Sequence, residues 1–215
     1  MKNPNEPNDK LTRTEIARAN RFAEKKEALL AQGYTYEEIT ANIVFANIMA
    51  FVYALPYTLL FGFLFLRSYG LRYDPSYNLN FLILVVLFFL CVVLHECIHA
   101  LFFGMFAEHH YRDIEFGVLW KYLTPYCYCA APLKRWQYVV GALMPTVVLG
   151  LGMGIVALLL GSGWMLLLSI FLFVGGGGDI LIVTMLLHYS VRNRDVIFMD
   201  HPTECGLCAF WKAVD

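Results

Sequence analysis

Two histidines and a glutamate in one apolar segment have the spacing of a metal-binding helix. The five residues read His95-Glu96-Cys97-Ile98-His99. Residues four apart share a helix face, so His95 and His99 can bind one metal ion, while Glu96 lies beside them as a candidate base for an attacking water. The surrounding run, 80–106, carries no other charged residue. Ionisable groups are costly in hydrocarbon and usually functional there, so we interpret these three as a catalytic metal site.

A third metal ligand is predicted in another apolar segment, at Asp179. A catalytic zinc site uses three protein ligands and keeps one position for water. His95, His99 and Asp179 make that set, which leaves Glu96 free to act as a base. His95 lies fifteen residues after Asn80, and Asp179 fifteen after Trp164. At about 1.5 Å per residue, both are expected about 22 Å along their helices, where they can meet.

Two backbone features are expected at the same depth. Proline at position 145 frees a backbone carbonyl, so Pro145 either shapes the site or only kinks its helix. Glycines disfavour a regular helical turn. Four of them together either loosen the helix and bring Asp179 to the metal, or allow close helix packing without a metal role. These four directly precede the aspartate: Gly175, Gly176, Gly177 and Gly178.

The composition is that of a multi-pass membrane protein. Hydrophobic residues make up 59% of the 215 and charged residues 15%, whereas soluble domains are about 25% charged. A helix needs about 20 apolar residues to cross a bilayer, and four segments qualify: 41–66, 80–106, 138–160 and 164–189. We therefore predict an all-α membrane protein with one four-helix domain over 41–189. The net charge of −1 gives no indication of a nucleic-acid partner.

The remaining parts are polar. Residues 1–40 are expected to form an arm with a solvated helix from Leu11 to Gln32, begun by a capping box of Thr12 and Glu15. A second capping box, of Thr35 and Glu38, is expected to start the first membrane helix. Residues 190–215 form a tail.

Lysine and arginine predict the orientation of the chain in the membrane. Fourteen of them lie in the arm, in the loop 107–137 and in the tail, against two on the opposite side. This bias predicts that both termini are cytoplasmic. The expected location is a prokaryotic cell membrane.

The loop between the second and third segments contains β-forming residues in partial alternation over 114–129. It is interpreted either as a short interfacial β-hairpin or as an amphipathic loop in the headgroups. A Cys127/Cys129 pair lies in this loop and a Cys205/Cys208 pair in the tail. Each pair could form a disulfide or a second metal site, but reduced thiols are the simpler interpretation on the cytoplasmic side.

The sequence resembles the putative zincin peptidases, a family of small polytopic membrane proteins. The resemblance rests on His95-Glu96-x-x-His99, the stretch 122–133 with Thr124-Pro125-Tyr126-Cys127, Met144-Pro145, and Gly178-Asp179-Ile180. It is more distantly similar to the site-2 intramembrane metalloproteases, which also place an aspartate ligand in a later span. Their Leu-Asp-Gly motif is not reproduced here.

These observations lead to one principal hypothesis. The chain is expected to be a zinc-dependent intramembrane or membrane-interface endopeptidase, with one Zn²⁺ held by His95, His99 and Asp179, and with Glu96 as its base. Its partners would be the bilayer and a membrane-embedded or membrane-proximal polypeptide substrate, and no nucleic acid. The alternatives are a non-catalytic metal-binding scaffold and a metal transporter.

Overall fold

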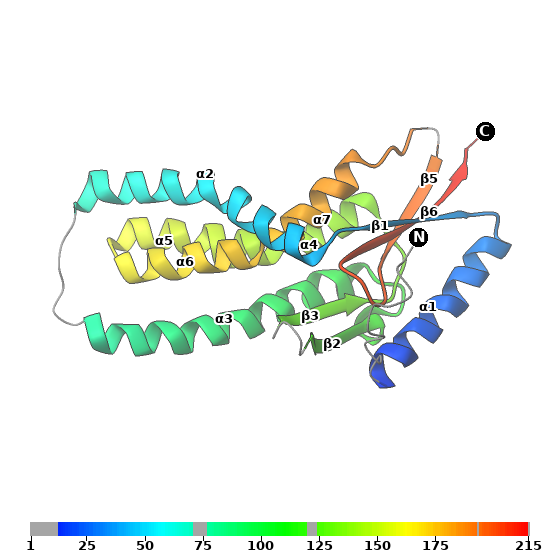
Figure 1. The fold of residues 1–215 in the computed structure, drawn as a ribbon, viewed down its shortest axis with the longest axis horizontal. Coiled ribbons are helices and arrows are strands. Elements are labelled where there is room, and N and C mark those ends of the chain that lie inside the picture. Colours follow the sequence, from blue (N-terminus) through cyan, green and yellow to red (C-terminus); the bar gives the residue numbers. More distant parts are fainter. Residues whose placement is uncertain (1–12, 71–76, 120–123, 193, 215) are drawn as a thin grey trace.

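The computed structural model describes residues 13–70, 77–119, 124–192 and 194–214. Apolar helices occupy one end of the elongated molecule, and the strands and the first helix gather at the other (Figure 1). Three helices in the described residues are long and apolar enough to cross a membrane, and a bent pair of helices makes a fourth candidate. The protein is therefore a mostly helical membrane protein with small antiparallel sheets.

The membrane helices coincide with the four predicted segments. Helix α2 covers Ile43–Tyr69 and α3 covers Tyr77–Phe106. Helix α4, Arg135–Pro145, continues through a π-helical stretch, Thr146–Gly152, into α5, Met153–Leu160. The fourth segment is the bent pair, α6 Gly163–Gly175 and α7 Gly177–His188, with an angle of 43° between them.

Small residues and one tyrosine hold the helices of the bundle together. A Cβ atom at Gly154 would overlap the Tyr57 hydroxyl, so glycine lets the tyrosine ring lie against α5. The Tyr57 hydroxyl donates to the carbonyl oxygen of Gly150 and lies 3.0 Å from the Ser169 hydroxyl. Satisfying polar groups in this way is required where no water is present.

A four-stranded antiparallel sheet lies at the polar end of the bundle. Its order is β1-β6-β5-β4, with β1 Thr35–Thr40, β4 Leu133–Lys134, β5 Arg194–Asp200 and β6 Gly206–Ala213. One buried cluster joins it to the membrane helices, because Phe198 and Leu207 of the sheet pack in the same core as Phe103 and Leu186. The segment 190–215, expected as a simple tail, is thus part of the core.

The expected start of the first membrane helix was wrong. Residues 35–40 form strand β1, paired with β6 in a register that places Thr35 opposite Trp211. Helix α2 instead begins after Asn42, whose side chain accepts a hydrogen bond of 2.8 Å from the Val44 amide. Pairing with a distant strand therefore outweighs the local capping pattern of Thr35 and Glu38.

The loop 114–129 contains the β-hairpin that was one of its two interpretations. Strand β2, Ile114–Leu119, pairs antiparallel with β3, Thr124–Cys129, so that Ile114 faces Cys129 and Leu119 faces Thr124. Helix α3 packs along β3 (Figure 1). Residues 120–123 lie outside the described part of the chain.

The arm helix α1, Arg13–Ala31, packs against the rest of the protein, whereas a solvated helix was expected. Phe22 and Leu29 are buried against Phe210 and Met199 of the sheet. Arg18 is only 6% exposed. The proposed Thr12 cap lies outside the described residues. The buried residues of this helix are Arg18, Phe22 and Leu29, and most of its other residues are polar. This composition explains why the sequence predicted a solvated helix.

Candidate metal centre

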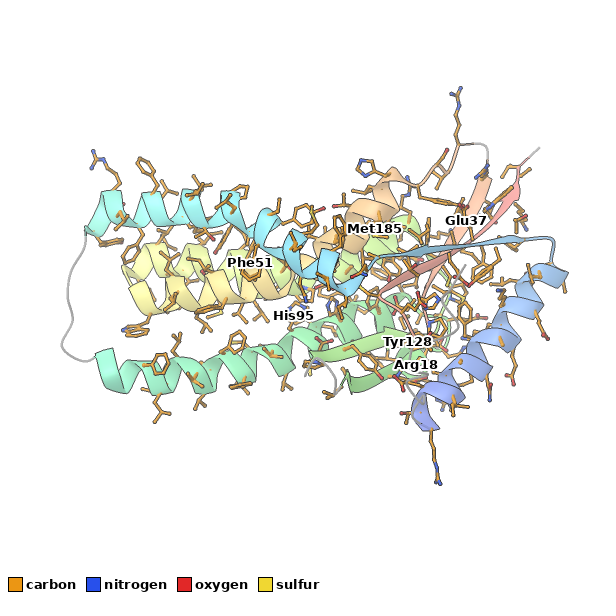
Figure 2. All side chains as sticks on the ribbon, in the orientation of Figure 1. Arg18, Glu37, Phe51, His95, Tyr128 and Met185 are labelled. Carbon is orange, nitrogen blue, oxygen red and sulfur yellow. The ribbon has the colours of Figure 1, made fainter. Side chains whose placement is uncertain are left out.

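The structure brings His95, His99 and Asp179 together. The two histidines lie on α3, four residues apart, and Asp179 lies in the first turn of α7. His95 Nε2 is 3.1 Å from His99 Nε2 and 3.1 Å from Asp179 Oδ2, and His99 Nε2 is 3.4 Å from Asp179 Oδ1. The three side chains are 12%, 8% and 21% exposed in that order. His95 lies in the part of α3 that approaches the hairpin (Figure 2).

These three side chains could hold one metal ion, because one ligand atom from each lies within 4.8 Å of the others. Zinc binds imidazole nitrogen and carboxylate oxygen at about 2.0–2.2 Å, so two ligand atoms in a tetrahedral arrangement lie about 3.3 Å apart. The 3.1 Å between the two imidazole Nε2 atoms is close to that value, while the contacts of Asp179 involve two different carboxylate oxygens, Oδ2 with His95 and Oδ1 with His99. Within the described part of the chain, this is the single group of three or more histidine, cysteine or acidic side chains close enough to hold an ion.

His99 is held in one orientation by the neighbouring helix α4. Its Nδ1 lies 2.9 Å from the carbonyl oxygen of Gly141. A carbonyl oxygen can only accept, so Nδ1 must carry the proton and Nε2 is left as the metal-binding atom. The Phe103 ring stacks on the imidazole, with a centroid distance of 5.8 Å and an angle of 12°. A Cβ atom at position 141 would overlap that ring, which explains the glycine.

Glu96 faces strand β3 and is not in the group of three metal-binding side chains. Its carboxylate accepts a hydrogen bond from the backbone amide of Cys127. The carboxylate is also close enough to His95, His99 and Asp179 to interact electrostatically with them. The acid is therefore close to the candidate ligands while a different element fixes its carboxylate.

The four glycines have two different surroundings. The α6–α7 break falls among them, and a Cβ atom at Gly177 would overlap the backbone of Ala50 in α2, while one at Gly176 would overlap the Thr146 hydroxyl. Gly175 and Gly178 have nothing within 4 Å of a built Cβ atom. The glycine run therefore combines a break between α6 and α7 with close packing of the first residue of α7 against α2.

Asp200 anchors strand β3 from the sheet, a role that the sequence did not reveal. Its carboxylate accepts hydrogen bonds from the Cys129 amide, at 2.7 Å, and from the Tyr138 hydroxyl. Burial raises the pKa of this carboxyl above 3.8, and the two hydrogen bonds only partly oppose that rise. An aspartate in a polar tail carries no signal by itself, so only the fold shows its position beside the site.

Arg18 holds the other face of the same strand. Its guanidinium lies over the rings of Tyr126 and Tyr128, 4.6 and 4.9 Å from their centroids, and donates to the Pro202 carbonyl at 3.2 Å. Arg18 and Tyr128 lie close together in Figure 2. Its Nε lies 3.7 Å from a Glu115 carboxylate oxygen. Alternate residues of a strand face opposite sides, so Arg18 contacts one face of β3 and the site lies beyond the other.

Lys25 fixes the base of the hairpin. Its ammonium group lies 3.2 Å from Asp113 Oδ1 and donates to the Ala130 carbonyl at 2.8 Å. Burial would raise the pKa of Asp113, but hydrogen bonds from the His109 amide and Lys25 outweigh it and lower that pKa. Helix α1 therefore holds the hairpin at two places.

The four polar-segment cysteines form no second metal group in the described residues, and all six cysteines are free thiols. Cys208 lies 3.5 Å from the Tyr36 hydroxyl. Burial raises the pKa of the Cys205 thiol, and the negative charge of nearby Asp179 raises it further. Burial likewise raises the pKa of Cys127. These thiols are therefore protonated near neutral pH.

Residues 88–192 match the sequence model of a family described as putative zincin peptidase. The resemblance predicted from the motifs is thereby confirmed over a region that contains His95, Glu96, His99 and Asp179. No curated protein and no solved structure matches the chain.

Proposed function

We propose that the protein is a zinc-dependent endopeptidase that acts on polypeptides within or at the surface of a membrane. The match of residues 88–192 to that peptidase family supports this proposal. One observation carries the proposal. His95, His99 and Asp179 converge closely enough to hold one metal ion, and Glu96 lies beside them with its carboxylate outside the ligand set.

The three converging side chains would hold the ion, and they leave room for a water or a substrate oxygen. When bound, zinc would polarise the scissile carbonyl and lower the pKa of water toward neutrality. Asp179 lies within 3.4 Å of both imidazoles and balances positive charge in a poorly solvated site.

Glu96 would move the proton. Its carboxylate would accept a proton from the attacking water and deliver it to the leaving amine. The hydrogen bond from the Cys127 amide holds that carboxylate at the β3 side of the site. The base and the metal ligands are thus fixed by different elements, one by a strand and the others by helices.

Strand β3 offers a place for an extended substrate. The Cys127 amide donates to Glu96 and the Cys129 amide donates to Asp200, so both point away from β2. Backbone groups at alternate positions share a direction, and Pro125, two residues before Cys127, has no amide hydrogen to satisfy at that edge. The amide donors at this edge are therefore already used, so a polypeptide lying in extended form next to Glu96 would pair with the carbonyl oxygens of the edge.

The depth of the site supports action near one membrane surface. His99 lies seven residues before Phe106, which ends α3, so the site is about 10 Å from that end. Lysine and arginine placement supports a cytoplasmic position for this surface and for both termini. Water would then reach the site from the side of the sheet.

The test is a comparison of wild type with Glu96→Gln. A membrane substrate trapped with the wild type should be cleaved at least about 100-fold faster than with Glu96→Gln, because general base catalysis contributes about that much. The variant should keep its zinc, because Glu96 is not a ligand.

Other outcomes would select the alternatives. Equal cleavage by both proteins would contradict the role of Glu96. Zinc binding without cleavage of any trapped membrane substrate would favour a metal-binding scaffold. Metal flux in proteoliposomes would indicate a transporter, a reading that a single metal group among the described residues does little to support.

A further inference from the structure

Proline at position 145 removes one donor from helix α4. In a regular α-helix the carbonyl of Gly141 accepts from the amide of residue 145. Pro145 has no amide hydrogen, so that bond cannot form. The next amide, of Thr146, donates to the carbonyl of Leu143. The Gly141 carbonyl is therefore available to a group outside the helix.

The group that uses this carbonyl is the His99 side chain. Its Nδ1 donates to the Gly141 oxygen at 2.9 Å, in a place where the His99 side chain is buried. A carbonyl left bare at this depth would be costly, because no water replaces the lost partner. The imidazole and the carbonyl thus satisfy each other, and Pro145, itself fully buried, keeps a competing amide away.

The consequence lies at the other ring nitrogen. With the proton on Nδ1, the lone pair of His99 is on Nε2, which lies 3.1 Å from His95 Nε2 and 3.4 Å from Asp179 Oδ1. The opposite tautomer would carry a hydrogen there and could not bind a metal ion through that atom.

We propose that Pro145 is a positioning residue of the metal centre. By lacking an amide hydrogen it reserves the Gly141 carbonyl for His99 and so fixes the tautomer and ring orientation that bind the ion through Nε2. This inference rests on the proposed metal site, and it assigns the proline an electronic and geometric role beyond kinking the helix.

The chain offers a matched control in Pro56. It also lies inside a membrane helix, α2, and frees the carbonyl of Val52, but it is exposed on the surface of the bundle. A general effect of proline on helix flexibility or insertion would appear in Pro56→Ala as well. An effect specific to the Gly141 carbonyl would appear only at position 145.

The experiment measures zinc affinity of purified full-length protein by competition with a chelator. Pro145→Ala should weaken zinc binding by about 10- to 100-fold, the range seen when a partner behind a metal ligand is lost. Pro56→Ala should not change it. Replacing Pro145 with lactic acid, which puts an ester where alanine has an amide, should restore most of the affinity because the competing hydrogen is again missing.

Two results would overturn the proposal. One is unchanged zinc affinity in Pro145→Ala. The other is an ester variant as weak as Pro145→Ala, which would show that the proline ring and not the missing hydrogen matters. If wild type binds no zinc, the proposed metal centre itself fails, which is a separate and distinguishable result.

A second measurement needs no substitution at position 145. Nitrogen NMR of zinc-loaded wild type, with the His99 signals identified by their loss in His99→Gln, should show a hydrogen on Nδ1. A hydrogen on Nε2 would overturn the proposal even if the position 145 variants do not fold.

Discussion

Two side chains of the site are held by contacts that do not depend on a bound ion. His99 is fixed by the Gly141 carbonyl and the Phe103 ring, and Glu96 by the Cys127 amide. Such support of ligands by surrounding groups is the usual way in which a metal site is kept in its binding geometry. We therefore expect small changes behind the ligands to alter zinc affinity.

Asp200 gives a pH prediction at the same scale. Its folded pKa is raised above 3.8 by burial, so the folded state holds this proton more tightly than the unfolded state. The resulting stability is fully present below pH 3.8 and is lost as the pH rises through the folded pKa. Asp200→Asn has no such proton, so the stability of wild type minus that of the variant should decrease with rising pH. Thermal unfolding of both proteins in detergent over a pH series measures this difference.

The comparison between the two proteins is its own control. Other titrating groups, including the histidines of the site, change both melting curves and cancel in the difference. A difference that stays constant or grows with rising pH would show that the Asp200 pKa is not raised.

At the scale of elements, the site depends on how α7 meets α2 and how the hairpin meets α3. The α6–α7 break lets α7 start against Ala50, two residues before Asp179. The hairpin is clamped between Asp200 on one side and Arg18 on the other. The metal ligands therefore need the helix packing, and the Glu96 partner needs the clamp.

The helix packing predicts a contrast between two neighbouring glycines. In Gly177→Ala the new methyl group would overlap the Ala50 backbone, so the helices must separate at a cost of about 1–3 kcal/mol, and Asp179 should shift from the histidines. Gly178→Ala meets nothing within 4 Å and should be neutral or slightly stabilising, because alanine favours helix. Melting temperature and zinc affinity of the two variants measure the effect. Equal behaviour would contradict the packing argument.

The clamp predicts an effect far from α3. Arg18→Ala removes a buried guanidinium from between Tyr126 and Tyr128, at a cost of about 3 kcal/mol, as for other broken buried pairs. The loosened strand should expose Cys127, whose alkylation by a maleimide in a protein with that single cysteine should become several-fold faster.

The control lies on the same helix. Arg13 is exposed, so Arg13→Ala should change stability by less than about 0.5 kcal/mol and leave alkylation unchanged. Slow alkylation in Arg18→Ala would mean that the strand is held without the arginine.

At the scale of the whole molecule, the sequence predicted the features that depend on local residue patterns. Long apolar runs gave the membrane helices, and the few charges inside those runs pointed to His95, His99 and Asp179. The polar-end sheet was missed because its partners are distant, as with Thr35 and Trp211, and because Glu37 and Glu38 look helical at a short range.

The supporting groups were missed for a related reason. Arg18 and Asp200 lie in polar segments where charged residues are common, and only packing shows that Arg18 is buried and that Asp200 is partly buried. The carbonyl of Gly141 is a backbone group, but its availability could be read from Pro145 four residues later. What the carbonyl binds depended on the placement of α4 against α3.

The central claim is tested most directly by the zinc content of purified protein, measured by elemental analysis. Wild type and Glu96→Gln should each contain about one zinc per chain, and His95→Ala and Asp179→Ala should contain much less, because two remaining ligands bind weakly. Asp195→Ala, at an exposed carboxylate in the sheet that bonds Tyr34, should match wild type. Wild type without zinc, or equal zinc in wild type and His95→Ala, would contradict the account.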